Sequence, residues 1–200
     1  MSNQTDDEGR VWHVAGPAKV DDDGTNEVYF PPDLVKSADI IRPDVEKVYW
    51  YYEQMVGYHL IGNARLKQSQ KESNQRQPIE TKFYEFVDDT KLTPLTADSD
   101  KTDESVTSYR NVVPKRFFED FTGQTGRRDP VPEKAQMEYG TTYYCIYHDE
   151  MAEGDIRSCY VLDSDEFAQA LPRGAASAFE TETETDDDDG PSLGDTPRFS

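Results

Sequence analysis

The sequence predicts an α+β fold with predominantly antiparallel strands, and an all-β sandwich or jelly roll is the alternative. Three observations support this prediction. The 200 residues are enough for one domain with tails. The aromatic content of 12% is too high for a chain that is disordered throughout. The clearest strands join as a hairpin, and strands do not alternate with helices as they do in parallel sheets.

Composition divides the chain into three parts. Residues 1–9 are predicted to form a flexible acidic N-terminal arm, residues 10–171 a single globular domain, and residues 172–200 an acidic C-terminal tail. Inside the domain, residues 88–105 are rich in Asp, Thr and Ser and are predicted to form an acidic loop. The tail carries a block of acids over 180–189, and such a block stays extended because its charges repel one another.

The first elements of the domain are short. Apolar residues predict a strand over 11–20, and the turn that follows is Asp21-Asp22-Asp23-Gly24. A second short strand over 27–30 stops at Pro31.

Residues 44–61 form the most informative apolar stretch. Their apolar positions recur at i, i+3, i+4 and i+7, which favours a helix with Asp44 as its N-cap. The same stretch is rich in β-forming residues, so a pair of strands is the competing interpretation. Three aromatic side chains fall outside the helical stripe and are candidate interface residues: Trp50, Tyr51 and Tyr58. The alternative is that a second layer of the same domain covers them.

The second half of the domain is predicted to contain short strands separated by turn and loop residues. Strands are predicted over 82–87 and 109–113, and a helix-like segment runs from Pro114 to Gly123. A short final helix is predicted over 163–171, after the hairpin described next.

The clearest hairpin spans residues 139–162. Apolar and aromatic side chains occupy both faces of its two strands, so we expect it to be covered on both sides. A hairpin centred near Ala152 places Cys145 directly opposite Cys159. The two cysteines then form either a cross-strand disulfide or, in a reducing cell, two buried thiols, and the second arrangement is favoured.

The charge of the chain indicates adaptation to salt. Asp and Glu number 41 against 21 Lys and Arg, which gives a formal charge of −20. Such self-repulsion destabilises a compact state in dilute buffer, but at 1 M salt the Debye length falls to about 3 Å. In composition the chain resembles salt-adapted proteins of halophilic archaea and their viruses. That resemblance implies a virion, or the cytoplasm of a halophilic host, as the place where it works.

Two segments of this acidic chain are basic. Residues 63–82 carry a net charge of +3 and many polar amides, and a smaller basic patch follows near residue 127. Both are candidate contacts for an acidic partner, or the cations pair with acids of the same chain. The candidate residues are Arg65, Lys67, Lys71, Arg76, Arg127 and Arg128.

No residue pattern indicates catalysis or a cofactor. The three histidines are far apart, and the sequence lacks CxxC, HExxH and glycine-rich phosphate-loop motifs. Two acidic clusters could hold a cation, although such clusters are expected by chance in an acidic protein. Their members are Asp21, Asp23, Asp149, Glu150, Glu153 and Asp155.

These observations favour a non-enzymatic structural or assembly protein adapted to high salt, with a capsid or head-associated virion subunit as the specific expectation. The expected partners are copies of itself or other subunits of an assembly. The alternative is a binding module that contacts an acidic partner or nucleic acid through residues 63–82 and 110–128. The net negative charge argues against nucleic acid. Neither a signal peptide nor a transmembrane segment is predicted.

Overall fold

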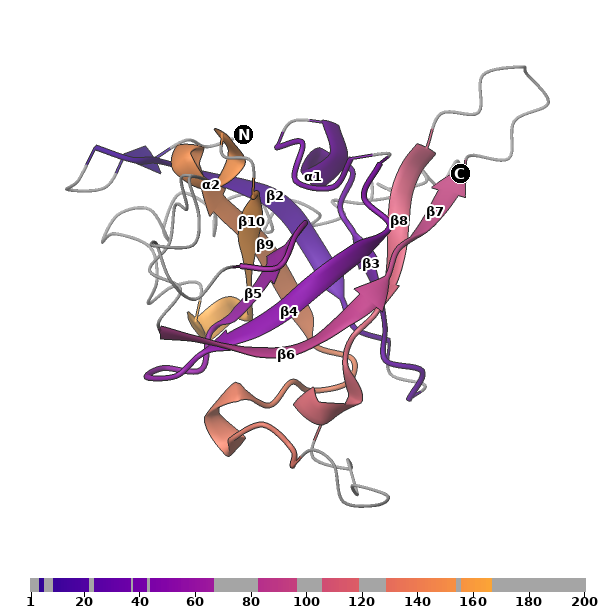
Figure 1. Cartoon of the computed structure of the whole chain (residues 1–200), viewed down its shortest axis with the longest axis vertical. Coiled ribbons are helices and arrows are strands. Elements are labelled where there is room, and N and C mark those ends of the chain that lie inside the picture. The colour runs from indigo at the N-terminus through magenta and orange to yellow at the C-terminus, as the bar shows by residue number, and fades with distance from the viewer. Residues whose placement is uncertain are drawn as a thin grey trace, which may run out of the picture.

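The computed structural model describes nine segments of the chain, and antiparallel strands dominate them (Figure 1). The helices in these segments are short, so the described fold is mostly β. It fits the all-β alternative better than the α+β expectation. The described residues are 4–5, 9–21, 24–36, 38–42, 44–66, 83–96, 106–118, 129–153 and 156–166.

The larger sheet has seven strands in the order β1-β2-β9-β10-β5-β4-β6. Each pairing within it is antiparallel. The strands are β1 (Gln4–Thr5), β2 (Val11–Lys19), β4 (Lys47–Glu53), β5 (His59–Gly62), β6 (Tyr84–Lys91), β9 (Thr142–His148) and β10 (Ser158–Leu162).

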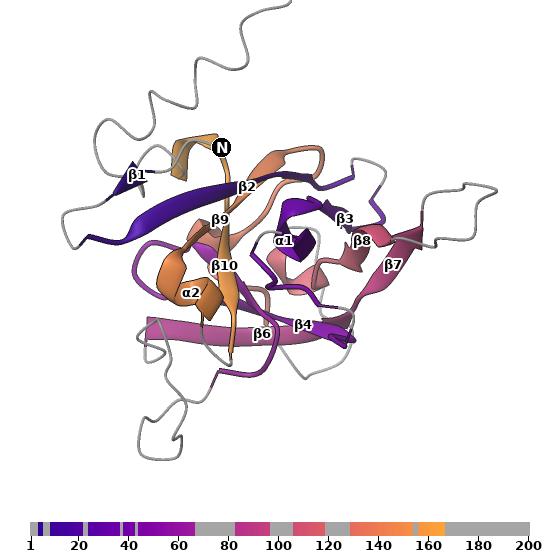
Figure 2. The same cartoon turned by 90° about the horizontal axis from the view of Figure 1, so that it is seen from above.

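The smaller sheet has three strands in the order β3-β8-β7. They are β3 (Glu27–Phe30), β7 (Thr93–Thr96) and β8 (Val106–Val112). Figure 2 shows that β6 of the larger sheet continues into β7 of the smaller one. At the other side an isolated bridge, Val20 to Val28, joins the end of β2 to β3. The two sheets are therefore linked at both sides and share one core.

Trp50 lies at the centre of this core. Its side chain is fully buried and packs against Phe30 of β3 and Phe117, with ring centroids 6.4 and 5.8 Å away. The indole N–H donates to Asn111 Oδ1 at 3.0 Å and to Thr90 Oγ1 at 3.1 Å. Because Asn111 belongs to β8, this polar contact ties the two sheets together inside an apolar interior.

Short helices close the ends of the sheets. They are α1 (Asp33–Lys36), α2 (Asp149–Glu153) and two 3₁₀ helices, Lys115–Phe117 and Glu133–Ala135. Leu34 of α1 and Met151 of α2 are buried in the core. Arg157 next to β10 pairs with the carboxylate of Asp39 after α1, which holds these two connections together.

The prediction of a helix over 44–61 is wrong, because this stretch forms the β4–β5 hairpin. Tyr49 pairs with Gly62 and Tyr52 with His59. Every residue of β5 is buried, and β4 is buried on both faces at its centre. A strand that is buried on both faces is apolar at nearly every position, so matches to the helical spacing arise without a helix.

The hairpin over 139–162 is confirmed as the pair β9 and β10, with its register shifted. Cys145 lies opposite Val161, not opposite Cys159 as expected. The shift is two residues, so both cysteines stay on the core face, where they are free thiols and fully buried. Burial raises the pKa of the Cys159 thiol, and the contact with Cys145 raises it further. The Cys159 thiol is therefore not an activated nucleophile.

Four further expectations need correction or fall outside the described residues. Residues 88–91 and 93–96 of the expected acidic loop belong to β6 and β7, while 97–105 lie outside the described residues. The segment after Pro114 is a single 3₁₀ turn, and its expected end at Gly123 is not described. Within the predicted arm, Gln4 and Thr5 pair with β2. The predicted tail, residues 172–200, lies outside the described part of the chain.

Candidate interaction site at the β4–β5 turn

The aromatic residues expected at an interface lie mostly inside the protein. Trp50 and Tyr51 are buried, and Tyr58 is half-buried. The Tyr51 hydroxyl accepts the Leu66 N–H at 2.9 Å, and its ring contacts Phe86. The expectation of an exposed surface is wrong for Trp50 and Tyr51, because other parts of the same chain cover both residues.

The described basic residues contact this protein's own groups. The guanidinium of Arg65 lies 4.5 Å from the centroid of the Phe86 ring. Arg110 pairs with Glu27 at 3.2 Å, and Arg116 donates to the carbonyl of Asp129 at 2.7 Å. The other candidates lie outside the described residues: Lys67, Lys71, Arg76, Arg127 and Arg128.

The candidate cation ligands do not meet in the described part of the chain. Within those ranges, no group of three or more His, Cys, Asp and Glu side chains is arranged to hold a metal ion. Asp149 instead accepts a hydrogen bond from His13, with Oδ1 and Nε2 2.6 Å apart. Asp21, Glu150 and Glu153 join no such group. Asp23 and Asp155 lie outside the described residues.

His59 is a structural core residue. It is buried in β5, and its Nε2–H donates to the carbonyl of Ala135 at 3.0 Å. The rings of Phe117 and Tyr143 stand edge-on to the imidazole. Burial lowers the pKa of His59, so the ring stays neutral near pH 7.

A polar cleft of about 430 Å³ lies beside the open end of the β4–β5 hairpin. Its two cations already have acidic partners. Arg42 lies 3.5 Å from Asp44, and the Lys47 ammonium donates to Asp89 at 2.7 Å. Each cation of the cleft thus faces a carboxylate, although the buried Arg42 Nε has no hydrogen-bond partner among the described residues.

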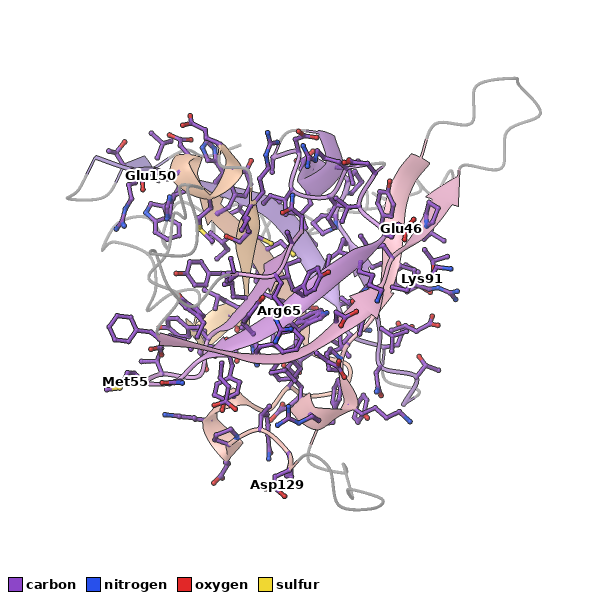
Figure 3. All side chains as sticks on the ribbon, viewed as in Figure 1. Glu46, Met55, Arg65, Lys91, Asp129 and Glu150 are labelled. Carbon is purple, nitrogen blue, oxygen red and sulfur yellow. The ribbon has the colours of Figure 1, made fainter. Side chains whose placement is uncertain are left out.

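The turn at the other end of this hairpin presents apolar side chains to solvent. Met55 is 74% exposed and Val56 is 51% exposed. Phe83, which precedes β6, is 42% exposed, and its carbonyl accepts the N–H of Gln54 in the turn. Met55, Val56 and Phe83 are called the apolar tip below. Figure 3 shows Met55 at the outer end of the hairpin, on the periphery of the molecule.

Hydrogen bonds from two charged side chains fix the shape of this turn. The Glu53 carboxylate accepts the N–H groups of Met55 at 2.8 Å and Val56 at 2.5 Å. The Lys134 ammonium donates to the carbonyl of Met55 at 3.0 Å and also to that of Gln54. Gly57 closes the turn with a φ of +93°, and its N–H donates to the Glu53 carbonyl. These contacts restrain the backbone of the turn.

This hydrogen bonding also lowers the cost of burying the tip. Each backbone N–H from Gln54 to Gly57 has a partner within the protein, as do the carbonyls of Gln54 and Met55. A buried backbone group without a partner costs about 1–3 kcal/mol, and these groups avoid that penalty. Water would satisfy the same groups in a turn that stays exposed. The hydrogen bonding of this turn is therefore compatible with its burial against another surface.

Glu166, beside the half-buried Tyr58, gives a pH-dependent prediction. It forms a reciprocal cap with Asp163: the Asp163 N–H donates to Glu166 Oε2 at 3.1 Å, and Asp163 Oδ1 accepts the Glu166 N–H at 2.8 Å. Asp163 therefore caps the start of the expected short helix, and residues 167–171 of that helix are not described. Burial raises the pKa of Glu166 from 4.5 to about 7.

Because the folded-state pKa lies above the unfolded one, ionisation of Glu166 destabilises the fold as pH rises from about 5 to 8. We expect Glu166→Gln to match the parent protein near pH 4.5 and to exceed its unfolding free energy at pH 8. After allowance for solvent screening the gain is about 1 kcal/mol. Urea denaturation at both pH values measures it, with Asp165→Asn as an exposed control. An equal effect of Glu166→Gln at both pH values would contradict the prediction.

Comparisons with family models, with curated proteins and with solved structures find no match to this chain. Among the described residues, no helix has the length and apolar content needed to cross a membrane.

Proposed function

We propose that this protein is a non-enzymatic structural subunit that joins other protein subunits through its apolar tip. The observation that carries the proposal is a turn with exposed Met55 and Val56 whose backbone polar groups are already bonded inside the protein. Met55 and Val56 are adjacent in the turn, and both leave apolar side chains in solvent that a partner surface could cover. Glu53 and Lys134 lie against the turn with opposite charges in a chain of charge −20.

The charge supports a setting of high salt. At −20 per chain, subunits repel one another strongly in dilute buffer, and molar salt screens this repulsion. Salt also strengthens the association of apolar surfaces. Both effects favour assembly through an apolar site. A capsid or head-associated subunit of a halophilic archaeal virus fits this combination, as does its mostly antiparallel β structure, whether or not the topology is a jelly roll.

The binding-module alternative has less support. It relies on residues 63–82 and 110–128, whose described arginines contact Phe86, Glu27 and a backbone carbonyl of the same chain. Those cations are engaged in holding the fold. An acidic partner would have to displace these contacts at an ionic strength that weakens electrostatic binding.

Light scattering across a protein concentration series in about 3 M KCl tests the proposal, because charge repulsion is screened there. We expect the mass to rise with concentration into defined oligomers or larger shells. The double variant Met55→Ser/Val56→Ser should stay monomeric at concentrations where the parent assembles. The matched control Lys91→Ser/Lys115→Ser changes two exposed residues away from the tip and should assemble like the parent.

Circular dichroism shows whether the tip variant keeps its fold, which is expected because both altered side chains are exposed. A parent protein that stays monomeric at every concentration would overturn self-assembly through the tip. Assembly that the tip variant retains unchanged would show that another surface joins the subunits.

A further inference from the structure

The polar cleft beside the open end of the β4–β5 hairpin has two side-chain donors without a hydrogen-bond partner in the part of the chain that the structure describes. They are Arg42 Nε and Asn63 Nδ2, and both atoms are buried. Both residues line the cleft, whose volume of about 430 Å³ lies within the range of small-molecule sites. Buried donors in folded proteins are nearly always bonded, so two of them at one cleft point to an acceptor that binds there.

Contacts with the residue before β10 fix the orientation of the Asn63 side chain. Its Oδ1 accepts the Arg157 N–H at 2.9 Å, and the Asn63 N–H donates to the Arg157 carbonyl, also at 2.9 Å. A backbone N–H can only donate, so the atom that it meets must be the amide oxygen. The amide nitrogen is therefore the group of this side chain that remains for a ligand.

Charged side chains of both signs surround the cleft. Arg42 lies 3.5 Å from Asp44, and Lys47 donates to Asp89 at 2.7 Å. Glu46 also lines the cleft, and it forms no ion pair with any residue that the structure describes. Acids thus outnumber bases among these residues, which disfavours a simple anion. A ligand that brings a carboxylate to the two donors is favoured when it also brings a cationic group to Glu46.

We propose that this cleft binds a small zwitterion of the α-amino acid class. Its carboxylate accepts hydrogen bonds from Arg42 Nε and Asn63 Nδ2, and its ammonium group faces Glu46. A carboxylate has two acceptor oxygens, which suits two separate donors of which one belongs to a guanidinium. Tyr49 also lines the cleft, and aromatic rings attract ammonium groups.

The cleft and the apolar tip lie at opposite ends of β4. Glu46 precedes this strand, and Met55 follows it. Figure 3 shows the two residues on opposite sides of the molecule. Ligand binding in the cleft is therefore separate from the proposed assembly, and either can fail without the other.

NMR of the isotope-labelled full chain in about 1 M KCl tests the site, because the Asn63 side-chain NH₂ gives its own signals and distant charges are screened. The probes are glycine, L-alanine and L-glutamine, each titrated to about 50 mM because ligands of so few atoms bind weakly. We expect saturable shifts of the Asn63 NH₂ signals with at least one of them. Acetate and methylammonium carry only one of the two charged groups and should give no saturable shift at the same concentrations.

Two variants test the donors, with binding followed by the main-chain amide signals of the cleft. Asn63→Asp keeps the acceptor for the Arg157 N–H and replaces Nδ2 by a second acceptor, so the affinity should fall by about tenfold or more. Arg42→Lys keeps the charge, removes the Nε–H and should weaken binding severalfold. Lys115→Gln changes an exposed residue that does not line the cleft, and this control should bind like the parent. Circular dichroism checks the fold of each variant.

The absence of a saturable shift with all three amino acids would overturn the site. An equal response to acetate would overturn the zwitterion, because the carboxylate alone would then account for binding. Unchanged affinity in both Asn63→Asp and Arg42→Lys would show that these donors do not hold the ligand. None of these results depends on whether the chain assembles, which light scattering measures separately.

Discussion

Replacement of Trp50 by Ala is expected to lower the free energy of unfolding by about 4 kcal/mol, the usual range for a large aromatic truncated in a core. The change removes a fully buried indole that packs against Phe30 and Phe117. It also deletes the donor that joins β4 to Asn111 of the smaller sheet. Domains have a total stability of about 5–15 kcal/mol, so this loss is a large fraction of the total.

The second tryptophan of the chain supplies the control for this measurement. Trp12 is half-buried on β2, so we expect Trp12→Ala to cost about 1 kcal/mol in the same urea titration in concentrated KCl. Trp50→Phe keeps most of the packing and removes the N–H donor, for a loss of about 2 kcal/mol. Similar losses for Trp12→Ala and Trp50→Ala would show that the space between the sheets is not the main core.

The sequence predicted the β9–β10 hairpin because its pattern was unambiguous. Its strands alternate between two apolar faces, and the structure places Cys145 in the main core and Tyr144 in a second cluster on the other face. The register could not be read in the same way. The connection contains α2, and the residues that this helix takes up shift the pairing by two positions. An even shift leaves every side chain on its predicted face.

The β4–β5 hairpin could not be identified from periodicity, and the candidate site was missed for the same reason. Met55 and Val56 were counted as members of an apolar helical stripe, whereas a turn exposes them. Glu53 and Gly57 were local signals of that turn. Lys134, which bonds to the turn from 79 residues away, could not be recognised from the sequence, because its role depends on the tertiary fold. Such a site can be predicted only when the residues that favour a turn are weighed before the hydrophobic spacing.

Gly57→Ala is the other substitution with a large expected effect, because the turn has no room for a side chain at this position. A Cβ on Gly57 would lie 2.1 Å from the carbonyl oxygen and 2.7 Å from the carbonyl carbon of Lys134. The φ of +93° is also unfavourable for any residue with a Cβ. The backbone of residue 134 must move, and its ammonium then leaves the carbonyls of the turn. We expect a loss of about 3 kcal/mol in unfolding free energy.

Gly24→Ala separates the two causes of this loss. Gly24 has a φ of +79°, but a Cβ there would meet nothing within 4 Å. It should lose only about 1 kcal/mol, from backbone strain alone. Hydrogen exchange adds a local readout: the amides of Met55 and Val56 should exchange faster in Gly57→Ala and at the parent rate in Gly24→Ala. Equal losses of stability in the two variants would mean that the Lys134 backbone moves at little cost. The tip would then not be a rigid surface.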